Sequence, residues 1–90
     1  MAVGKFLKDP QDVLDYQIDW SDWLGTDTIS TSAWTVETGI TKDSDTYSDT
    51  IAVIWVSGGT AGTSYELVNH IVTTAGREAD RTITIVCADR

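Results

Sequence analysis

The sequence holds few side chains of the kinds that catalyse reactions or bind metals, and its one histidine is His70. A single histidine excludes metal sites built on two histidines. His70 lies in an apolar run that predicts a strand, on the face shared with Glu66, Val68 and Val72. This position indicates a histidine at the surface or in an interface, and we expect no catalytic role for it.

The one cysteine, Cys87, falls in phase with Ile83 and Ile85, which predicts a small buried apolar residue. No neighbouring motif indicates an activated thiolate. Because one cysteine cannot form an internal disulfide, we expect a core that is stable without cross-links.

Three carboxylates, Asp43, Asp45 and Asp49, have the spacing of positions 1, 3 and 7 of a calcium-binding loop. Such a loop also needs glycine at position 6 and glutamate at position 12, where this sequence has Ser48 and Ile54. The EF-hand motif therefore fails, and we predict no metal and no cofactor. A weak, irregular calcium site stays open as an alternative.

A glycine-rich run from Gly58 to Gly62 lacks the lysine and the following helix of a phosphate-binding loop. These glycines instead predict a tight turn. Tyr65 follows at the start of the next predicted strand, which is the position of the tyrosine corner in immunoglobulin-like sandwiches. We therefore predict a structural role for Tyr65.

The four tryptophans support two interpretations. Trp20 and Trp23 lie three residues apart and could form a platform for sugar rings, as in a carbohydrate-binding module. Trp20, Trp34 and Trp55 each alternate in phase with apolar neighbours, which favours the core. We predict Trp34 and Trp55 as large core residues. The abundant carboxylates do not by themselves indicate a glycosidase, because a sandwich of this length has little room for a cleft, and we predict no enzyme.

Fourteen acidic residues against six basic residues give a formal net charge of −8. This excess argues against nucleic-acid partners and anionic membrane surfaces, both of which attract lysine and arginine. No apolar run approaches the ~20 residues of a membrane span. Asp15, Asp19 and Asp22 belong to an acidic cluster that forms either a solvated face or an attachment point for a basic partner.

We expect one small domain over residues 11–90, preceded by an N-terminal extension over residues 1–10. Alternating apolar and polar residues predict a strand over residues 14–20, followed by one helical turn that Gly25 closes. Further strands are expected over 28–30, 33–37, 49–57, 64–74 and 81–88, with turns or a short edge strand over 38–45. About seven short strands predict an all-β fold, an antiparallel β-sandwich of immunoglobulin-like or fibronectin-III-like type.

The run Ile51 to Val56 is apolar on both strand faces, which marks either a covered central strand or a protein contact. Trp23 and Leu24 are expected to be exposed in the helical turn. We therefore predict that the protein works by assembly and that its interface is drawn from Asp15, Asp19, Asp22, Trp23, Leu24, Ile51, Val53, Ile54 and Val56.

A resemblance that covers nearly the whole chain is carried by several runs, among them Lys8-Asp9-Pro10, Asp19-Trp20-Ser21-Asp22-Trp23-Leu24, Ser32-Ala33-Trp34-Thr35-Val36, Ser57-Gly58-Gly59-Thr60-Ala61-Gly62-Thr63-Ser64-Tyr65 and Val68-Asn69-His70-Ile71-Val72. In these runs the sequence resembles a family of small structural proteins of tailed bacteriophages with an immunoglobulin-like fold, some of them fibre–tail adaptors. The serine- and glycine-containing run is the most specific part of the resemblance.

The resemblance implies a non-enzymatic virion protein, made in the bacterial cytoplasm, that mediates assembly as a tail or fibre adaptor or a head–tail component. It implies partners among the other tail, fibre or capsid proteins, and it is compatible with a homo-oligomer. Capsid decoration and carbohydrate binding on a host-recognition fibre are the alternatives. The resemblance specifies neither the position in the virion nor the copy number.

Overall fold

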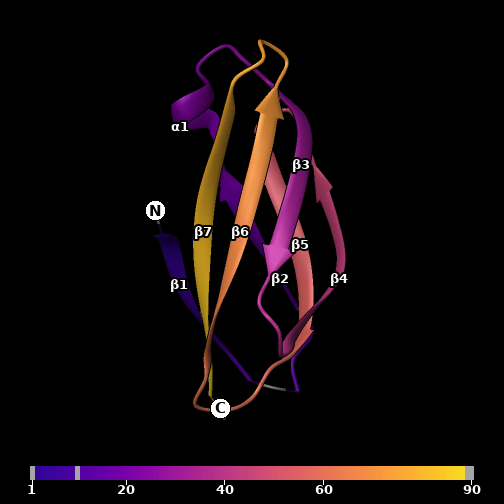
Figure 1. Cartoon of the computed structure of the whole chain (residues 1–90), viewed down its shortest axis with the longest axis vertical. Coiled ribbons are helices and arrows are strands. Elements are labelled where there is room, and N and C mark those ends of the chain that lie inside the picture. The colour runs from indigo at the N-terminus through magenta and orange to yellow at the C-terminus, as the bar shows by residue number, and fades with distance from the viewer. Residues whose placement is uncertain (1, 10, 89–90) are drawn as a thin grey trace.

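The computed structural model describes residues 2–9 and 11–88 and shows a narrow, elongated sandwich of two sheets (Figure 1). Its elements are β1 (Ala2–Lys8), β2 (Leu14–Asp19), α1 (Ser21–Leu24), β3 (Ile29–Val36), β4 (Ile40–Tyr47), β5 (Ile51–Gly58), β6 (Ser64–Thr73) and β7 (Glu78–Cys87). Within the described ranges, no helix is long and apolar enough to cross a membrane.

The strand order confirms the predicted immunoglobulin-like sandwich. One sheet has the order β1-β7-β6-β3 and the other has the order β2-β5-β4. In an immunoglobulin constant-type domain, strands C, F and G form one sheet and strands B, E and D belong to the other. The sheets β3-β6-β7 and β2-β5-β4 reproduce these two groups. All pairs are antiparallel except β1 with β7, which is parallel.

Residues 2–8, predicted as part of an extension, form β1 against the last strand of the chain. The register runs from Ala2 opposite Thr82 to Lys8 opposite Cys87. The Lys8 side chain is fully buried, and its Nζ donates hydrogen bonds to the carbonyl oxygens of Gly58 at 2.6 Å and Asp9 at 3.0 Å. Parallel pairing between the two ends of a chain depends on tertiary structure, so local patterning does not reveal it.

The boundaries of β2, β5, β6 and β7 lie within three residues of those predicted from the periodicity, but β3 and β4 differ from the prediction. β3 is one strand where two were predicted, and an irregular register between Ile29 and Thr31 interrupts its pairing with β6. β4 replaces the expected turns and short edge. Only Ile40 of β4 is buried, because β4 is an edge strand whose other residues are exposed.

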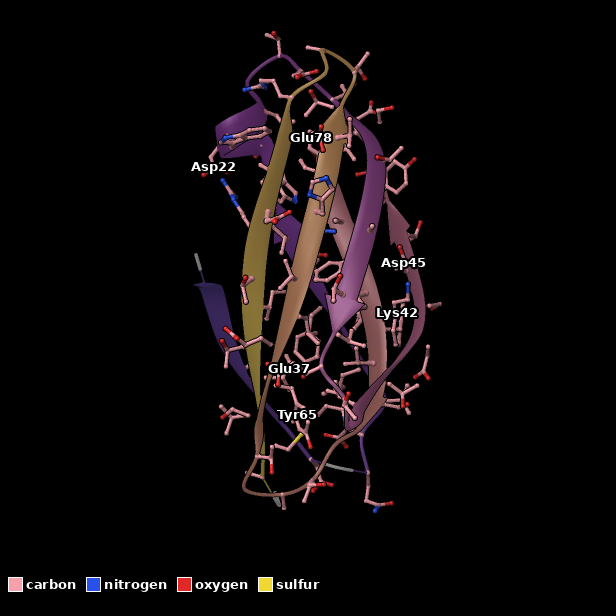
Figure 2. All side chains as sticks on the ribbon, in the orientation of Figure 1. Asp22, Glu37, Lys42, Asp45, Tyr65 and Glu78 are labelled. Atoms are coloured by element: carbon pink, nitrogen blue, oxygen red, sulfur yellow. The ribbon has the colours of Figure 1, made fainter. Side chains whose placement is uncertain are left out.

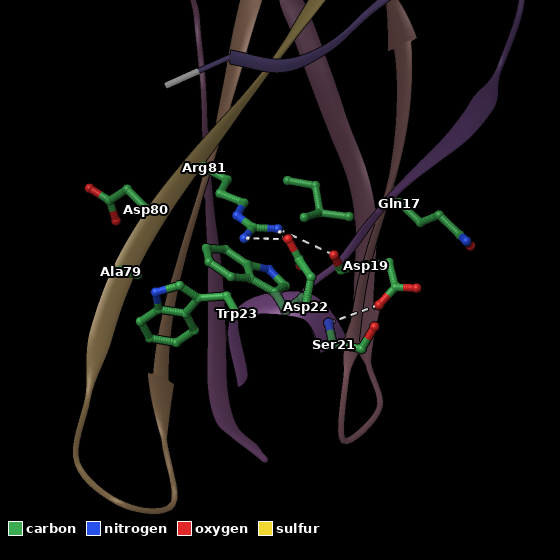
Figure 3. A pocket seen from close by; sticks show the side chains of 10 residues that line it. Gln17, Asp19, Ser21, Asp22, Trp23, Ala79, Asp80 and Arg81 are labelled. Carbon is green, nitrogen blue, oxygen red and sulfur yellow. Dashed lines mark hydrogen bonds and ion pairs between the residues drawn. The ribbon is translucent and has the colours of Figure 1, made fainter. Parts of the chain in front are cut away.

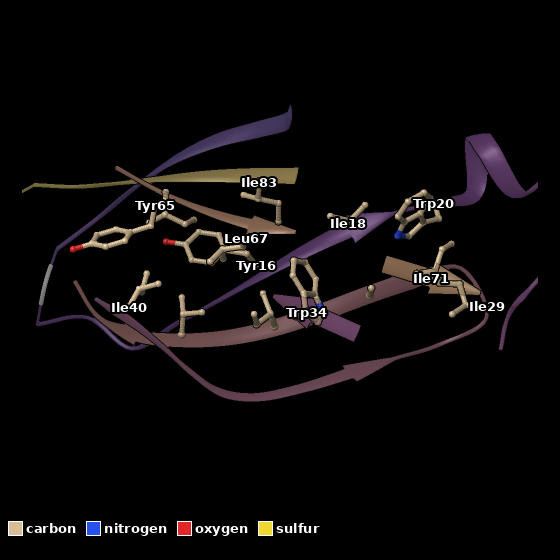
Figure 4. Close-up of a cluster of buried hydrophobic side chains, with 14 of the residues drawn as sticks. Tyr16, Ile18, Trp20, Ile29, Trp34, Ile40, Tyr65, Leu67, Ile71 and Ile83 are labelled. Carbon is tan, nitrogen blue, oxygen red and sulfur yellow. The ribbon is translucent and has the colours of Figure 1, made fainter. Parts of the chain in front are cut away.

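The core lies between the sheets, with inward residues at every second position of the strands (Figure 4). Trp34 is 7% exposed and belongs to it, whereas the prediction of Trp55 as a core residue is wrong. The inward residues of β5 are Ala52, Ile54 and Val56, so Trp55 points outward and is 41% exposed. A run that is apolar at every position has no phase in the sequence, and only the opposite sheet selects the inward side.

Tyr65 lies at the start of β6 and is buried. Its hydroxyl oxygen accepts a hydrogen bond of 2.9 Å from the backbone N–H of Thr60, which is the bond of a tyrosine corner. The ring also packs closely on the backbone of the β3–β4 turn, because a Cβ built on Gly39 would lie 3.0 Å from Tyr65 Cε1. The tyrosine therefore holds two connections at the same end of the sandwich.

A buried polar network joins the two sheets near the other end. Asn69 is fully buried in β6, and its Oδ1 accepts a hydrogen bond of 3.0 Å from Trp20 Nε1. Asn69 Nδ2 donates to Ser32 Oγ at 2.9 Å and to the Ala33 carbonyl oxygen at 3.1 Å. The Trp20 indole is thereby fixed at the entrance to α1, which determines how the neighbouring surface is built.

Candidate protein-interaction site

A partly exposed apolar stripe runs along the outer face of the sheet β2-β5-β4, and we call Ile51, Val53 and Trp55 the outer stripe. These residues alternate with the inward residues of β5, and Trp55 is the most exposed of them. Apolar side chains on a solvent-facing sheet surface are a feature of protein-contact sites. The outer stripe therefore has the chemistry of a docking surface.

Polar residues border the outer stripe on both sides. The β2 register places Asp15 opposite Trp55, Gln17 opposite Val53 and Asp19 opposite Ile51, and all three β2 residues are exposed. On the other side, β4 places Ser44 and Thr46 opposite Trp55 and Val53. The outer stripe therefore has an acidic border along β2, formed by Asp15 and Asp19.

A hollow of about 670 Å³ opens beside this face, between β2 and α1 on one side and β7 on the other (Figure 3). We call it the α1 hollow, and its walls are formed by Gln17, Ile18, Asp19, Trp20, Ser21, Asp22, Trp23, Ala79, Asp80 and Arg81. The helical turn stands where the sequence predicts it, and Gly25 ends it with a φ of 63°. This turn brings Trp20 and Trp23 into edge-to-face contact, with ring centroids 5.6 Å apart.

Two arginines from the β6–β7 hairpin cover these indoles. The Arg81 guanidinium carbon lies 4.4 Å from the Trp20 ring centroid, and that of Arg77 lies 4.3 Å from the Trp23 centroid. Such cation–π contacts hold an aromatic ring and a cation in a defined geometry. Trp20 is only 1% exposed, so the two indoles do not form the exposed pair on which the sugar-platform alternative relies.

The Asp22 carboxylate and the Asp19 carbonyl oxygen orient Arg81, the cation of the α1 hollow. Arg81 Nη1 lies 3.2 Å from Asp22 Oδ1 and also donates to the Asp19 carbonyl oxygen at 3.3 Å (Figure 3). Asp19 Oδ1 accepts a hydrogen bond from the Ser21 backbone N–H, which lowers the pKa of Asp19 from its usual value. Both carboxylates stay at the solvent surface and contribute negative charge to the rim of the hollow.

Asp27 anchors the loop after α1 to the β6–β7 turn. It accepts hydrogen bonds from the backbone N–H groups of Thr28 and Ala75, and its Oδ2 lies 3.1 Å from Arg77 Nε. A hydrogen bond from Thr73, supported by these partners, lowers the pKa of Asp27 to about 2. Arg77 also donates to the Leu24 carbonyl oxygen at 2.9 Å, at the end of α1. We call Asp27 and Arg77 together the Asp27 clamp, because they tie α1 to the β6–β7 turn.

Acid should weaken this clamp. Because the pKa of Asp27 is about 2 in the folded protein and 3.8 without its partners, Asp27 stabilises the fold above pH 3.8. That contribution is lost as the pH falls toward 2. We expect Asp27→Asn to melt at a lower temperature than the wild type at neutral pH, with the two melting temperatures converging in acid. A gap that stays constant down to the lowest pH would contradict the assignment.

His70 lies on the outer face of the other sheet, between two acidic side chains of β7. Its Nδ1 lies 2.5 Å from Asp80 Oδ1 and its Nε2 lies 3.0 Å from Glu78 Oε1. The Asp80 hydrogen bond, with that of Glu78, raises the pKa of His70 above 6.5. The surface position agrees with the sequence-based interpretation.

The charge state of His70 should therefore affect stability at neutral to basic pH. The stabilisation by the imidazolium is fully present below pH 6.5 and is lost as the pH rises through the higher pKa of the folded protein. We expect an NMR titration of the His70 ring to give a midpoint above 6.5 and Asp80→Asn to lower it. An unchanged midpoint in that variant would remove Asp80 as the cause.

The carboxylates considered for calcium lie on β4 rather than in a loop, apart from Asp49 in the β4–β5 turn. Asp45 pairs with Lys42 at 3.4 Å (Figure 2), and Asp43 accepts a hydrogen bond from Ser57 Oγ at 3.1 Å. Across the part of the chain that the structure describes, no cluster of three histidine, cysteine or acidic residues is arranged to hold a metal ion.

The predicted interface residues separate into two groups at the surface and a buried remainder. Half-buried Ile51 and Val53 belong to the outer stripe with exposed Asp15 beside them, and Asp22 and Trp23 line the α1 hollow. Trp23, which was predicted to be exposed, is half-buried because Arg77 covers its ring. Asp19 lies between these groups and borders both.

Leu24, Ile54 and Val56 are corrections, because they are 3%, 0% and 0% exposed and belong to the core. Leu24 turns inward because the one-turn helix rotates it away from Trp23, and the two β5 residues face the opposite sheet. Trp55, Arg77 and Arg81 are surface residues that the interface prediction omits. No pattern within β5 could have placed Trp55 outward, because every position of the run is apolar. Its orientation becomes visible only in the structure, where β2 sets exposed Asp15 opposite Trp55.

The comparison with protein families agrees with this architecture. Residues 8–86 match the family described as "Podophage GP4 fiber-tail adaptor protein gp77". No curated protein matches the chain. The match spans the sandwich from the last residue of β1 to the penultimate residue of β7 and includes both surfaces described above. The chain therefore belongs to the family of podophage GP4 fiber-tail adaptor proteins.

Proposed function

We propose that this protein is a non-enzymatic virion component that joins a fibre to a podophage tail, made in the host cytoplasm and incorporated during assembly. The observation that carries the proposal is the family match over residues 8–86, which supports a structural assembly role. The outer stripe supplies the docking surface through which one partner is bound. The protein's function is then to present rigid faces to other virion proteins.

Trp55 is the centre of this docking surface. Large aromatic side chains contribute much of the binding energy at protein interfaces when a partner covers them. Trp55 is 41% exposed, and its neighbours in the sheet hold its backbone rigid on the central strand. The bordering Asp15 and Asp19 favour a partner with an apolar centre and a basic rim.

Truncating Trp55 should impair assembly without unfolding the protein. We expect Trp55→Ala to reduce incorporation into particles at least tenfold when it complements a phage that lacks this gene. The measurement is the amount of the protein in purified particles, together with the number of fibre-bearing tails in electron micrographs. Because the ring faces solvent in the free protein, the melting temperature should change little.

Tyr47→Ala is the matched control. Tyr47 is an aromatic residue with a similar exposure of 43%, and it lies on the β4 edge, outside the outer stripe. Its removal breaks one surface hydrogen bond, which the Tyr47 hydroxyl donates to the Ser30 carbonyl oxygen. Equal incorporation of Trp55→Ala and wild type, or an equal loss with Tyr47→Ala, would refute the outer stripe as the docking surface.

A further inference from the structure

β7 is longer than β1, the strand that pairs with its edge away from β6. β7 spans Glu78–Cys87, whereas the register of β1 begins at Ala2 opposite Thr82. Figure 1 shows β1 beside one half of β7 only, with α1 beside the far end of the other half. Within the described residues, no strand pairs with Glu78–Arg81 on the side away from β6. Such an edge offers backbone groups to another chain.

The uncovered edge borders the α1 hollow. Ala79, Asp80 and Arg81 form one wall of the hollow, and residues 17–23 form the facing wall. Four residues of strand span about 13 Å at roughly 3.3 Å each, enough for a short extended segment. The hollow thus provides space next to backbone to which no other described strand pairs on that side.

We propose that a short, extended, basic segment of a partner virion protein binds in the α1 hollow by adding a strand to Glu78–Arg81. This inference rests on the proposed function, since it names how an assembly partner would be held. Main-chain hydrogen bonds to β7 would provide affinity, and contacts of alternate side chains with the hollow would provide specificity.

The charges around the hollow select a basic occupant. Its rim carries the carboxylates of Asp19 and Asp22, and the Asp22 side chain is 75% exposed. The Asp80 carboxylate points away from the hollow and pairs with His70 (Figure 3). The single cation of the lining, Arg81, is 18% exposed and packs against Trp20 beside Asp22. A second copy of this chain, with a net charge of −8, would bring like charge to the same rim. A segment that carries lysine or arginine meets the opposite sign.

Peptide titration of the isotope-labelled full chain tests the inference directly. The probe is a capped six-residue peptide of alternating lysine and valine, compared with the same peptide bearing N-methyl groups on alternate residues and with a glutamate–valine peptide. We expect saturable NMR shifts at the amides of residues 78–81 and at the Trp23 indole N–H. The methylated peptide should bind at least tenfold more weakly, and the glutamate peptide should not bind.

Two variants localise the charge contribution. Asp22→Asn should weaken the lysine peptide several-fold, whereas Glu66→Gln removes the same charge from the exposed face of β6 and should leave binding unchanged. Absence of shifts at residues 78–81, equal binding of the methylated peptide, or self-association at this edge instead of peptide binding would each overturn the inference.

The outcome is distinguishable from that of the proposed function. Trp55→Ala leaves the α1 hollow intact, so it should bind the lysine peptide as the wild type does while failing to assemble. If Trp55→Ala assembles normally but the peptide still binds at Glu78–Arg81, the outer stripe is wrong and strand addition stands. If the peptide does not bind but Trp55→Ala fails to assemble, strand addition is wrong and the outer stripe stands as the docking surface.

Discussion

Replacing Asn69 with leucine is expected to lower the free energy of unfolding by about 3 kcal/mol, because buried polar partners lose their hydrogen bonds. Asn69 is 0% exposed and connects Trp20 in one layer to Ser32 and Ala33 in the other. Leucine has a similar size but satisfies none of these groups. The buried Trp20 N–H would then have no acceptor, which accounts for most of the loss. Chemical denaturation measures the effect.

Ser32→Ala provides the comparison within the same network. It removes only the bond from Asn69 Nδ2 to a half-buried hydroxyl, so we expect a loss of about 1 kcal/mol or less. If Asn69→Leu were no more destabilising than Ser32→Ala, the network would not be a main support of the Trp20 position. The geometry of the α1 hollow would then have to depend chiefly on the arginine contacts.

Replacing Gly59 with alanine is expected to cost about 3 kcal/mol, from backbone strain and overlap together. Gly59 has a φ of 97°, a conformation that residues with a Cβ rarely adopt. An added Cβ would also overlap Cys87 Sγ, which is fully buried at the end of β7. The turn before the tyrosine corner therefore needs glycine for two separate reasons.

Gly62→Ala separates those reasons. Gly62 has a φ of 87° in the same turn, but a Cβ built there has no heavy atom within 4 Å. We expect only the strain, about 1 kcal/mol. In a Cys87→Ala background, which removes the sulfur, the cost of Gly59→Ala should fall to about that of Gly62→Ala. An equal cost of Gly59→Ala in both backgrounds would contradict the predicted overlap.

Both predictions concern the ends of the sandwich, where the connections that shape the surfaces are anchored. The Asn69 network and the Asp27 clamp hold α1, and α1 forms one wall of the hollow. The Gly59 turn and Tyr65 hold the opposite end, where Lys8 also joins β1 to β5. The outer stripe lies on the strand between these ends. Rigid anchoring of this kind preserves docking faces in a domain without disulfides.

The amino-acid sequence by itself determined the strands that have one side in the core and the other in solvent. In β2, buried Tyr16 and Ile18 alternate with exposed Asp15 and Gln17. The alternation of apolar and polar residues in the sequence predicts this difference between the two sides of the strand. The helical turn closed by Gly25 and the tyrosine at the start of β6 likewise depend on neighbouring residues only. Together these features were sufficient to predict the immunoglobulin-like sandwich.

The tertiary structure alone decided which side of β5 faces out and what the two ends of the chain do. Both sides of β5 are apolar, so its phase depends on the sheet opposite, which buries Ile54 and leaves Trp55 for a partner. The parallel pairing of β1 with β7 joins residues nearly a chain length apart, and no local signal encodes it. Within the described residues, Glu78–Arg81 of β7 have no strand partner on the side away from β6, because the pairing with β1 stops at Thr82. Which side of a strand is left without a partner depends on its neighbours in space rather than on its own residues.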